Sequence, residues 1–501
     1  MSVESARRYF ALAALVTVVT SCGDGATEPA NGRPGITVVA GAGITDTVDA
    51  QPVQGLIVEV RDAAGRAVPG ALVRFQPRPL SDPVIEASVF VCALTVPMCP
   101  ASEFVANQTD PAGRAKVAIR MGTVFGKAVI LVTVPELGLQ DSAMVTVAAG
   151  APAAIFVYPR DTVLDVGGTV TMYGQAMDRY GNARSELATF SAGAGNSVTV
   201  DGPSNLGTLV TARDMGTQRA YAHIGNLTDS AVVRVVPAGR LVVWSPGLST
   251  AVRLVNIDGK DAQTLITDVG SDFGVFPRFD PTRHRITLHS ATQSSVGPSS
   301  DAIVLDTTGT ARRDIIGFSS IIAVRETDDG NAMVVGRRFG DPDGYYVFRV
   351  TADNTITLLG TLNGFSGAYG GADIAYDGSR VAYIAGSTLN VLNVSTGAVT
   401  NLVNGARSPR WSVQGDRLVY LFPSTCPNAP DGVATVINPD GSGRRVLTNF
   451  CFSPGLAWSP DAKYIIGRSS QDWPDVGLRV VRVSDGVDVL TRFDYYQPDW
   501  R

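Results

Sequence analysis

Few side chains in this sequence are spaced for bond-making chemistry. There are three histidines, His223, His284 and His289, and no Gly-x-Ser-x-Gly motif, because the run 364–367 (Gly-Phe-Ser-Gly) lacks that spacing. Neither His284 nor His289 stands in the chain order of a hydrolase triad, and we expect both to flank a strand at the surface. The sequence therefore predicts no catalytic residue and no enzyme.

Metal and cofactor sites are also not indicated. Asp/Asn-Gly turns occur at 328–330, 341–344 and 438–441, where the acidic side chains are of the type that binds calcium. They lack the 12-residue loop with a closing Glu, and hairpin turns require Asp-Gly and Asn-Gly pairs for conformational reasons alone. We expect neither a bound metal nor a cofactor.

The cysteines favour disulfide chemistry. Besides Cys22 there are four, and they form two neighbouring pairs, Cys92 with Cys99 and Cys426 with Cys451. An even number of cysteines in an exported protein favours disulfides, and neither pair has the spacing of zinc ligands. We expect two disulfides.

The N-terminus predicts export. Arg7 and Arg8 precede a short apolar run, Tyr9–Val19, which ends in small residues before Cys22, as in a cleaved signal peptide. Val-Thr-Ser-Cys resembles the bacterial lipobox, which implies that residues 1–21 are removed and that Cys22 carries the lipid that binds the membrane. The alternative is an ordinary signal peptide in which Cys22 has no special role.

The segment behind the expected lipid has its own signals. Residues 22–35 are rich in Gly, Pro, Asn and Ala and should form a flexible tether. Gly23, not Asp, follows Cys22, which resembles the outer-membrane address of proteobacterial lipoprotein sorting. We expect an exported protein anchored to the outer membrane, facing the periplasm or the cell surface.

Length and composition indicate several all-β domains. The chain has 501 residues, 45% of them hydrophobic and 17% charged, with 53 Gly and 29 Pro among short alternating apolar runs. Its net charge is −5, with no basic stripe. Nucleic acid is therefore not an expected partner.

Two modules of alternating strands follow the tether. In residues 36–149, an Asp-x-x-Gly turn at 62–65 and a Thr-Asp-x-x-Gly turn at 109–113 resemble those of bacterial immunoglobulin-like modules of the invasin and intimin type. Residues 150–237, with a turn at 178–182, resemble another such group more loosely. Strand spacing independently suggests sandwiches. We expect both modules to be spacers.

The remainder, residues 238–501, is repetitive. Six equivalent points are 47, 48, 37, 47 and 42 residues apart, close to the period of a four-stranded propeller blade: Phe279, Glu326, Ile374, Trp411, Trp458 and Trp500. Trp411-Ser412 and the run 458–461 (Trp-Ser-Pro-Asp) resemble the repeats of TolB-type propellers, a periplasmic family. The resemblance implies a six-bladed β-propeller.

The repeat is split between the two ends of this segment. Residues 497–501 begin a unit whose second half lies at 239–244. We therefore expect the C-terminal strand to pair with the strand at 240–244 and to close the ring.

One face of the expected ring is a candidate binding surface. The connections between second and third strands are long, at 290–301, 337–345, 422–432 and 469–477, and strand alternation brings them to one face. Aromatic, Arg and Asp residues typical of interfaces form the candidate binding face: Trp473, Asp472, Tyr345, Tyr346, Arg337, Arg338, Tyr369 and Tyr495. The alternative, which we favour for any single ring, is packing between blades. Cys426–Cys451 would stiffen this face.

These features predict a lipid-anchored binding or scaffold protein whose propeller recognises a protein or peptide. The alternative is binding of glycans or cell-wall polysaccharide by aromatic stacking. A propeller hydrolase or lyase is a third hypothesis, which carboxylates and histidine converging in the central channel would favour.

Overall fold

The computed structural model describes residues 34–82, 86–94, 99, 104–202, 207–245, 250–267, 275–280, 285–290, 302–327, 329–365, 367, 371–423, 426, 431–470, 477–491 and 495–500. Their regular structure is β-strand apart from one 3-10 turn, η1 (Pro135–Leu137), so the all-β prediction is confirmed. The leader, Cys22 and most of the tether lie outside these residues. None of the helices in the described part is long and apolar enough to cross a membrane.

The chain divides into two compact units. One comprises Met1–Ile155 and Gln175–Glu186, and the other comprises Phe156–Gly174 and Leu187–Arg501.

The first predicted module contains two sheets. One has the order β1 (Gly35–Ala40), β3 (Leu56–Arg61), β7 (Arg114–Met121), β5 (Val89–Cys92); the other has the order β2 (Thr45–Thr47), β9 (Leu139–Ala148), β8 (Gly126–Val134), β4 (Leu72–Pro77), β6 (Val105–Gln108). Buried and exposed residues alternate along β7 and β8, and the buried set forms one core. The Cys92–Cys99 disulfide predicted from sequence is present, with Cα atoms 5.3 Å apart.

The second predicted module also contains two four-stranded sheets. One has the order β10 (Pro152–Tyr158), β12 (Thr169–Asp178), β15 (Thr208–Ala212), β14 (Val198–Val200); the other has the order β11 (Asp161–Asp165), β17 (Leu227–Val236), β16 (Gly216–Ile224), β13 (Thr189–Ala192). β11 pairs with β17 in parallel, and β16 pairs with β17 along its whole length.

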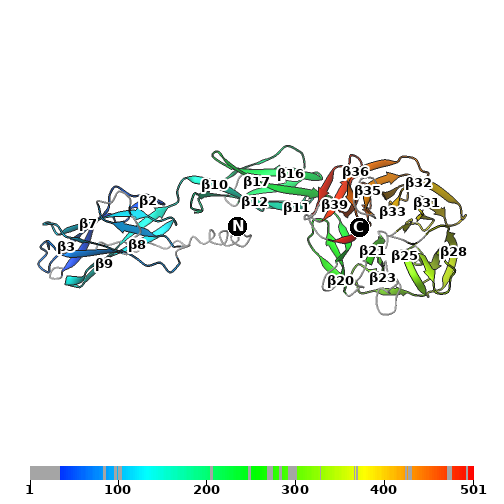
Figure 1. Ribbon diagram of the computed structural model, residues 1–501, viewed down its shortest axis with the longest axis horizontal. Coiled ribbons are helices and arrows are strands. Elements are labelled where there is room, and N and C mark those ends of the chain that lie inside the picture. The colour runs from blue at the N-terminus through cyan, green and yellow to red at the C-terminus, as the bar shows by residue number, and fades with distance from the viewer. Residues whose placement is uncertain are drawn as a thin grey trace. The chain divides into compact units, whose positions relative to one another are not determined.

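Six four-stranded antiparallel sheets follow among the described residues, and Figure 1 shows them arranged around a common centre as the blades of a β-propeller. In order from the inner strand outward they are β41 (Tyr496–Trp500), β18 (Arg240–Ser245), β19 (Ala251–Asn256), β20 (Gln263–Thr267); β21 (Val275–Asp280), β22 (Arg285–Ser290), β23 (Ala302–Asp306), β24 (Arg312–Ile315); β25 (Phe318–Glu326), β26 (Ala332–Arg338), β27 (Tyr345–Val350), β28 (Ile356–Leu362); β29 (Ala372–Ile374), β30 (Arg380–Ala385), β31 (Thr388–Asn393), β32 (Val399–Asn404); β33 (Arg407–Trp411), β34 (Leu418–Phe422), β35 (Gly432–Ile437), β36 (Arg445–Phe452); β37 (Ala457–Trp458), β38 (Tyr464–Arg468), β39 (Leu478–Arg482), β40 (Asp488–Leu490).

The two ends of this segment share a sheet. β41 pairs antiparallel with β18, with Leu241 opposite Trp500 and Val242 opposite Asp499. The C-terminal strand therefore has the neighbour that the split repeat predicts.

The six equivalent points of the repeat are structurally equivalent as well. Each lies on the inner strand of its sheet, and all six are buried: Phe279, Glu326, Ile374, Trp411, Trp458 and Trp500. Glu326 is the polar exception, and its carboxylate pairs with Arg285 at 3.0 Å. Five of the six therefore fill the space between neighbouring sheets with apolar surface, which stabilises them by burial.

The part of the second module that belongs to the second unit packs against the propeller. Met215 and Val236 share a buried cluster with Val255 and Ile257 of the first blade. The backbone turn after β19, where Gly259 N–H donates to Asn256 C=O, closes a tight hairpin at this end of the blade. Strand alternation puts that hairpin on the side of the propeller opposite the long connections.

Candidate functional site

The strand limits confirm the four long connections between second and third strands. They run from β22 to β23, from β26 to β27, from β34 to β35 and from β38 to β39, whereas β30 and β31 are separated by only two residues. Inner strands run toward the short turns, so the second strand of each blade ends at the face from which the long connections emerge. Of these, the connection 339–344 lies entirely within the described residues.

The 339–344 connection presents an exposed aromatic ring. Phe339 is 75% exposed, a high value for an aromatic side chain in a folded domain. Asp341 Oδ2 accepts a hydrogen bond from the Arg338 N–H at 3.0 Å, and Arg337 pairs with Asp343 at 3.1 Å. The first of these bonds turns the connection back on its start, and the second is a surface ion pair, so Phe339 projects from a turn that is hydrogen-bonded at Arg338.

Two tyrosines of the candidate face, Tyr345 and Tyr346, use their rings in packing beside this loop and add little to its exposed surface. Tyr345 is half-buried and meets Phe365 edge to face at 5.2 Å, and Tyr346 packs on Phe348 at 6.0 Å. Both rings therefore pack against a neighbouring aromatic side chain. The structure brings Arg337, Arg338, Tyr345 and Tyr346 to the two ends of one loop.

The other predicted face residues are elsewhere or outside the described part. Tyr495 is half-buried against the cluster that contains Trp500. Asp472 and Trp473, as well as Tyr369, lie outside the described residues. Sequence reasoning missed Phe339, although its setting between Arg338 and Gly340 in a predicted long loop was a usable signal.

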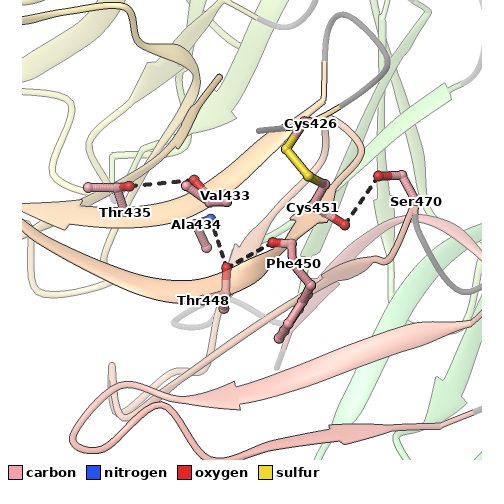
Figure 2. Close-up of a disulfide and its surroundings, with 8 residues drawn as sticks. All are labelled: Cys426, Val433, Ala434, Thr435, Thr448, Phe450, Cys451 and Ser470. Carbon is pink, nitrogen blue, oxygen red and sulfur yellow. Dashed lines mark hydrogen bonds between the residues drawn. A yellow bond between two sulfur atoms is a disulfide. The ribbon is translucent and has the colours of Figure 1, made fainter. Parts of the chain in front are cut away.

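The predicted Cys426–Cys451 disulfide is present at this face (Figure 2), with Cα atoms 5.7 Å apart. It joins the β34–β35 connection to β36, and Cys451 is fully buried. The ladder between β35 and β36 shifts register here, and Thr448 Oγ1 accepts from the Ala434 N–H at 3.2 Å and donates to Phe450 C=O at 3.1 Å. The hydroxyl thus replaces part of the interrupted ladder.

A second arrangement, which the sequence analysis does not predict, lies in the centre of the propeller. The residue before each of the six equivalent points is Arg278, Arg325, Asp373, Arg410, Ala457 or Asp499, and all six are buried. Strand alternation puts each of these side chains on the sheet face opposite that of its equivalent point. Arg278, Asp373 and Arg410 line a small central cavity, whereas Ala457 packs in an apolar cluster with Trp500. Five of the six carry a formal charge, which is rare for buried positions.

These charged side chains bond to the backbone of the next blade. Asp373 Oδ2 accepts from the Trp411 N–H at 2.9 Å, and Asp499 Oδ2 accepts from the Phe279 N–H at 2.5 Å. Arg325 Nε donates to Ile374 C=O at 2.8 Å. Each bond therefore joins one inner strand to the equivalent point of its neighbour.

The centre also contains cation–carboxylate and cation–π contacts. Arg325 Nη2 is 3.4 Å from Asp373 Oδ1, and its guanidinium lies 3.7 Å from the ring centroid of Tyr376. Burial and the nearby Arg278 lower the pKa of Arg410 to about 9. Burial raises the pKa of Asp499, an effect that Arg278 and Arg325 oppose.

The position of His289 differs from the surface position expected from the sequence. It lies on β22, is only 3% exposed and stacks on Phe276 at 5.3 Å, so the predicted surface position is wrong for this histidine. Burial, and then Arg278 and Arg410, lower its pKa to about 3, so the ring is neutral at pH 7. His284 lies outside the described residues. Periodicity missed His289 because β22 is buried on both faces.

The chemistry available in the centre is limited by its size. The cavity lined by Arg278, His289, Asp373 and Arg410 has a volume of about 10 Å³. Such a space admits one water-sized species and no organic substrate. One carboxylate, Asp373, and one histidine, His289, line this cavity, and Asp373 already accepts a hydrogen bond from the neighbouring blade. No group of three or more metal-ligating side chains occurs among the described residues.

Comparisons with known proteins place the chain near propellers only at low similarity. No family model and no curated protein matches it. Among solved structures, TolB from Acinetobacter baumannii is similar at 12% identity over 62% of this chain and 82% of that one, with a TM-score of 0.41. A putative TolB from Agrobacterium tumefaciens has 12% identity over 50% and 88%, with a TM-score of 0.37. An oligogalacturonate lyase in complex with manganese has 14% identity over 65% and 86%, with a TM-score of 0.32. At these values the similarities carry no information on ligand or activity.

Proposed function

We propose that this protein is a lipid-anchored binding protein of the cell envelope whose propeller recognises a protein or peptide through the 339–344 loop and its flanks. The observation that carries this proposal is Phe339, 75% exposed on a short loop whose backbone is hydrogen-bonded to Asp341 at Arg338. An exposed ring on an ordered support is the kind of residue that dominates binding energy, because little conformational entropy is lost when a partner covers it.

The architecture in this proposal has five parts. Residues 1–21 are the signal peptide, 22–35 the tether with lipid on Cys22, 36–149 and 150–237 immunoglobulin-like spacers, and 238–501 a closed six-bladed ring of the TolB type. The pairing of β41 with β18 supports closure. The two disulfides support export, because oxidising compartments maintain them, and Gly23 supports an outer-membrane address.

A binding role is favoured over catalysis and over sugar stacking. The central cavity of about 10 Å³ offers no room for a substrate in the described part of the ring. Tyr345 and Tyr346 use their rings for packing, which leaves less aromatic surface for stacking on a glycan. The proposed partner is therefore a polypeptide, and we propose no cofactor and no enzymatic activity.

The test uses a matched pair of exposed apolar residues in one blade. A photo-crosslinking residue is introduced at Phe339 or at Leu358, which is 57% exposed on the outer strand β28, in the full chain expressed in its native envelope. We expect a discrete protein adduct from position 339 and none from 358. Phe339→Ala should then weaken binding of that purified partner about tenfold or more, and Leu358→Ala should not.

Two results would contradict the proposal. Equal adducts from both positions, or equal affinities of the two alanine variants, would remove the 339–344 loop from recognition. Retention of an envelope polysaccharide that survives protease treatment of the extract would instead assign the face to glycans.

A further inference from the structure

The central cavity has the charge and the donors of an anion site. Its lining includes two guanidiniums, Arg278 and Arg410, and one carboxylate, Asp373, together with the neutral ring of His289. The remaining lining consists of 322–324 and Ala372, which are apolar residues. One positive charge is therefore in excess over the negative charge at the cavity wall.

Two nitrogen atoms at this cavity have no protein partner. Arg410 is 5% exposed; its Nη1 donates to Pro409 C=O at 3.2 Å and to Ala372 C=O at 3.5 Å, but its Nε has no hydrogen-bond partner. His289 Nδ1 is also buried without a partner, but the neutral ring has a single N–H, which bonds to the Ile322 backbone, so only the Arg410 N–H lacks an acceptor. A buried N–H of a cation that lacks an acceptor is strongly unfavourable, so it indicates an acceptor that protein atoms do not supply.

We infer that the central cavity binds one small inorganic anion of the halide class, such as chloride, in contact with Arg410 and Arg278. A volume of about 10 Å³ fits one monatomic ion or one water molecule and excludes carboxylate, sulfate and phosphate. Charge favours a monatomic anion over a water molecule, because an anion balances the excess guanidinium charge where solvent does not screen it.

The anion would act on the same contacts that join the blades. Arg410 C=O accepts from Trp458 Nε1 at 3.1 Å, and Asp373 accepts from the Trp411 N–H. An ion that fixes the Arg410 guanidinium therefore stabilises three inner strands, β29, β33 and β37. This role is independent of the 339–344 loop and of the partner proposed for it.

Bromide provides the direct test, because its anomalous scattering distinguishes it from water. The full chain is crystallised from a halide-free buffer and soaked in sodium bromide. We expect one anomalous peak in the central cavity, within about 3.5 Å of Arg410 Nε. Density without an anomalous signal would show that water fills the cavity and would overturn the inference.

Thermal unfolding provides the second test at constant ionic strength. Replacing sodium gluconate with 0.2 M chloride or bromide should raise the Tm by several degrees, because a ligand that binds only the folded state stabilises it. Arg410→Gln should abolish this halide-specific shift, and Arg312→Gln, on the outer strand β24, should retain it. Equal Tm values of the wild-type protein in gluconate and chloride would contradict the inference, and this comparison remains decisive if Arg410→Gln fails to fold.

Discussion

The carboxylate of Asp499 accepts a hydrogen bond at 2.5 Å from the backbone N–H of Phe279, which lies 220 residues earlier in the chain. The residue beside it, Trp500, is opposite Leu241 in the shared sheet. The last strand therefore contacts its neighbour on one side through a backbone ladder and on the other through a buried side chain. Both contacts have to form before the first and last parts of the propeller are held together.

Replacement of Asp499 tests how much the side-chain contact contributes. Asp499→Ala leaves the Phe279 N–H without its acceptor and removes a negative charge near Arg278 and Arg325, so we expect the free energy of unfolding to fall by about 3 kcal/mol. Asp499→Asn keeps an acceptor oxygen and should lose less. Urea denaturation followed by tryptophan fluorescence measures both.

The control is Asp343→Ala, because the Asp343 side chain is fully exposed and its pairing with Arg337 is a surface ion pair. It should change stability by less than about 0.5 kcal/mol. If Asp499→Ala behaves like this control, the centre of the propeller does not join the blades in the way described.

The blade pattern was predictable because its signals are local. Five of the six equivalent points are apolar or aromatic, and three of them, Phe279, Trp411 and Trp458, directly precede Asp or Ser; the structure buries all six positions. The strand limits on either side of the long connections also agree with the sequence, because period-2 alternation stops where Gly, Pro and Asp begin.

The central charges could not be predicted in the same way. Arg278, Arg325 and Arg410 lie beside the equivalent points, where alternation alone assigns either solvent or channel to a polar side chain. Their burial depends on inner strands of different blades meeting around one cavity, which is a property of the folded propeller and not of a single repeat. The change from Arg to Asp at this position between blades was the available signal.

The backbone conformation three residues before the equivalent points could not be predicted from the sequence either. Ser408 and Gln497 have positive φ values of 46° and 49°, each three residues before Trp411 or Trp500, and the corresponding residue before Trp458 is Gly455. Only Gly adopts this region without steric strain, so one residue of the three fits the expected preference.

The Cys426–Cys451 disulfide should stabilise the long-connection face. Replacing both cysteines by serine opens a covalent loop with a sequence separation of 25, for which the loss of stability expected from chain entropy is about 3 kcal/mol. Hydrogen exchange in β35 and β36 should rise most, because Thr448 and Ser470 depend on the position of this strand.

The matching variant replaces Cys92 and Cys99 by serine in the first sandwich, where the separation is 7. Its exchange should rise around β5 and leave β35 and β36 unchanged. Unaltered exchange at β36 in the first variant would mean that the register shift, and not the disulfide, fixes this edge.

Met215 tests the packing of the second sandwich on the propeller. Met215→Ala removes a side chain that is 2% exposed from the cluster it shares with Val255 and Ile257. We therefore expect the free energy that stabilises this contact to fall by about 2 to 4 kcal/mol. Limited proteolysis in the link between β17 and β18 should accelerate, because the two modules separate more often. Leu209→Ala, at an exposed position of the same sandwich, should leave the cleavage rate unchanged.

Asp165 should make the same contact sensitive to pH. Burial, and then repulsion from Asp258, raise its pKa to about 6, which Lys260 partly opposes, and its Oδ1 is buried without a hydrogen-bond partner. The folded state therefore binds a proton more tightly than the unfolded chain, whose carboxyl group has a pKa near 3.8. Stability from this group is lost as pH rises through 6 and is regained as pH falls toward 4.

Asp165→Asn mimics the protonated side chain at every pH. At pH 7.5 we expect this substitution to raise the free energy of unfolding of the protein by about 1 to 2 kcal/mol. At pH 4.5 we expect it to have little effect. Thermal unfolding from pH 4.5 to 8 compares the variant with the wild-type chain and with Asp201→Asn, an exposed carboxylate in the same sandwich. A constant difference between Asp165→Asn and the wild type across this range would show that the carboxyl group does not titrate near pH 6, because only a proton bound unequally by the two states produces a pH-dependent difference.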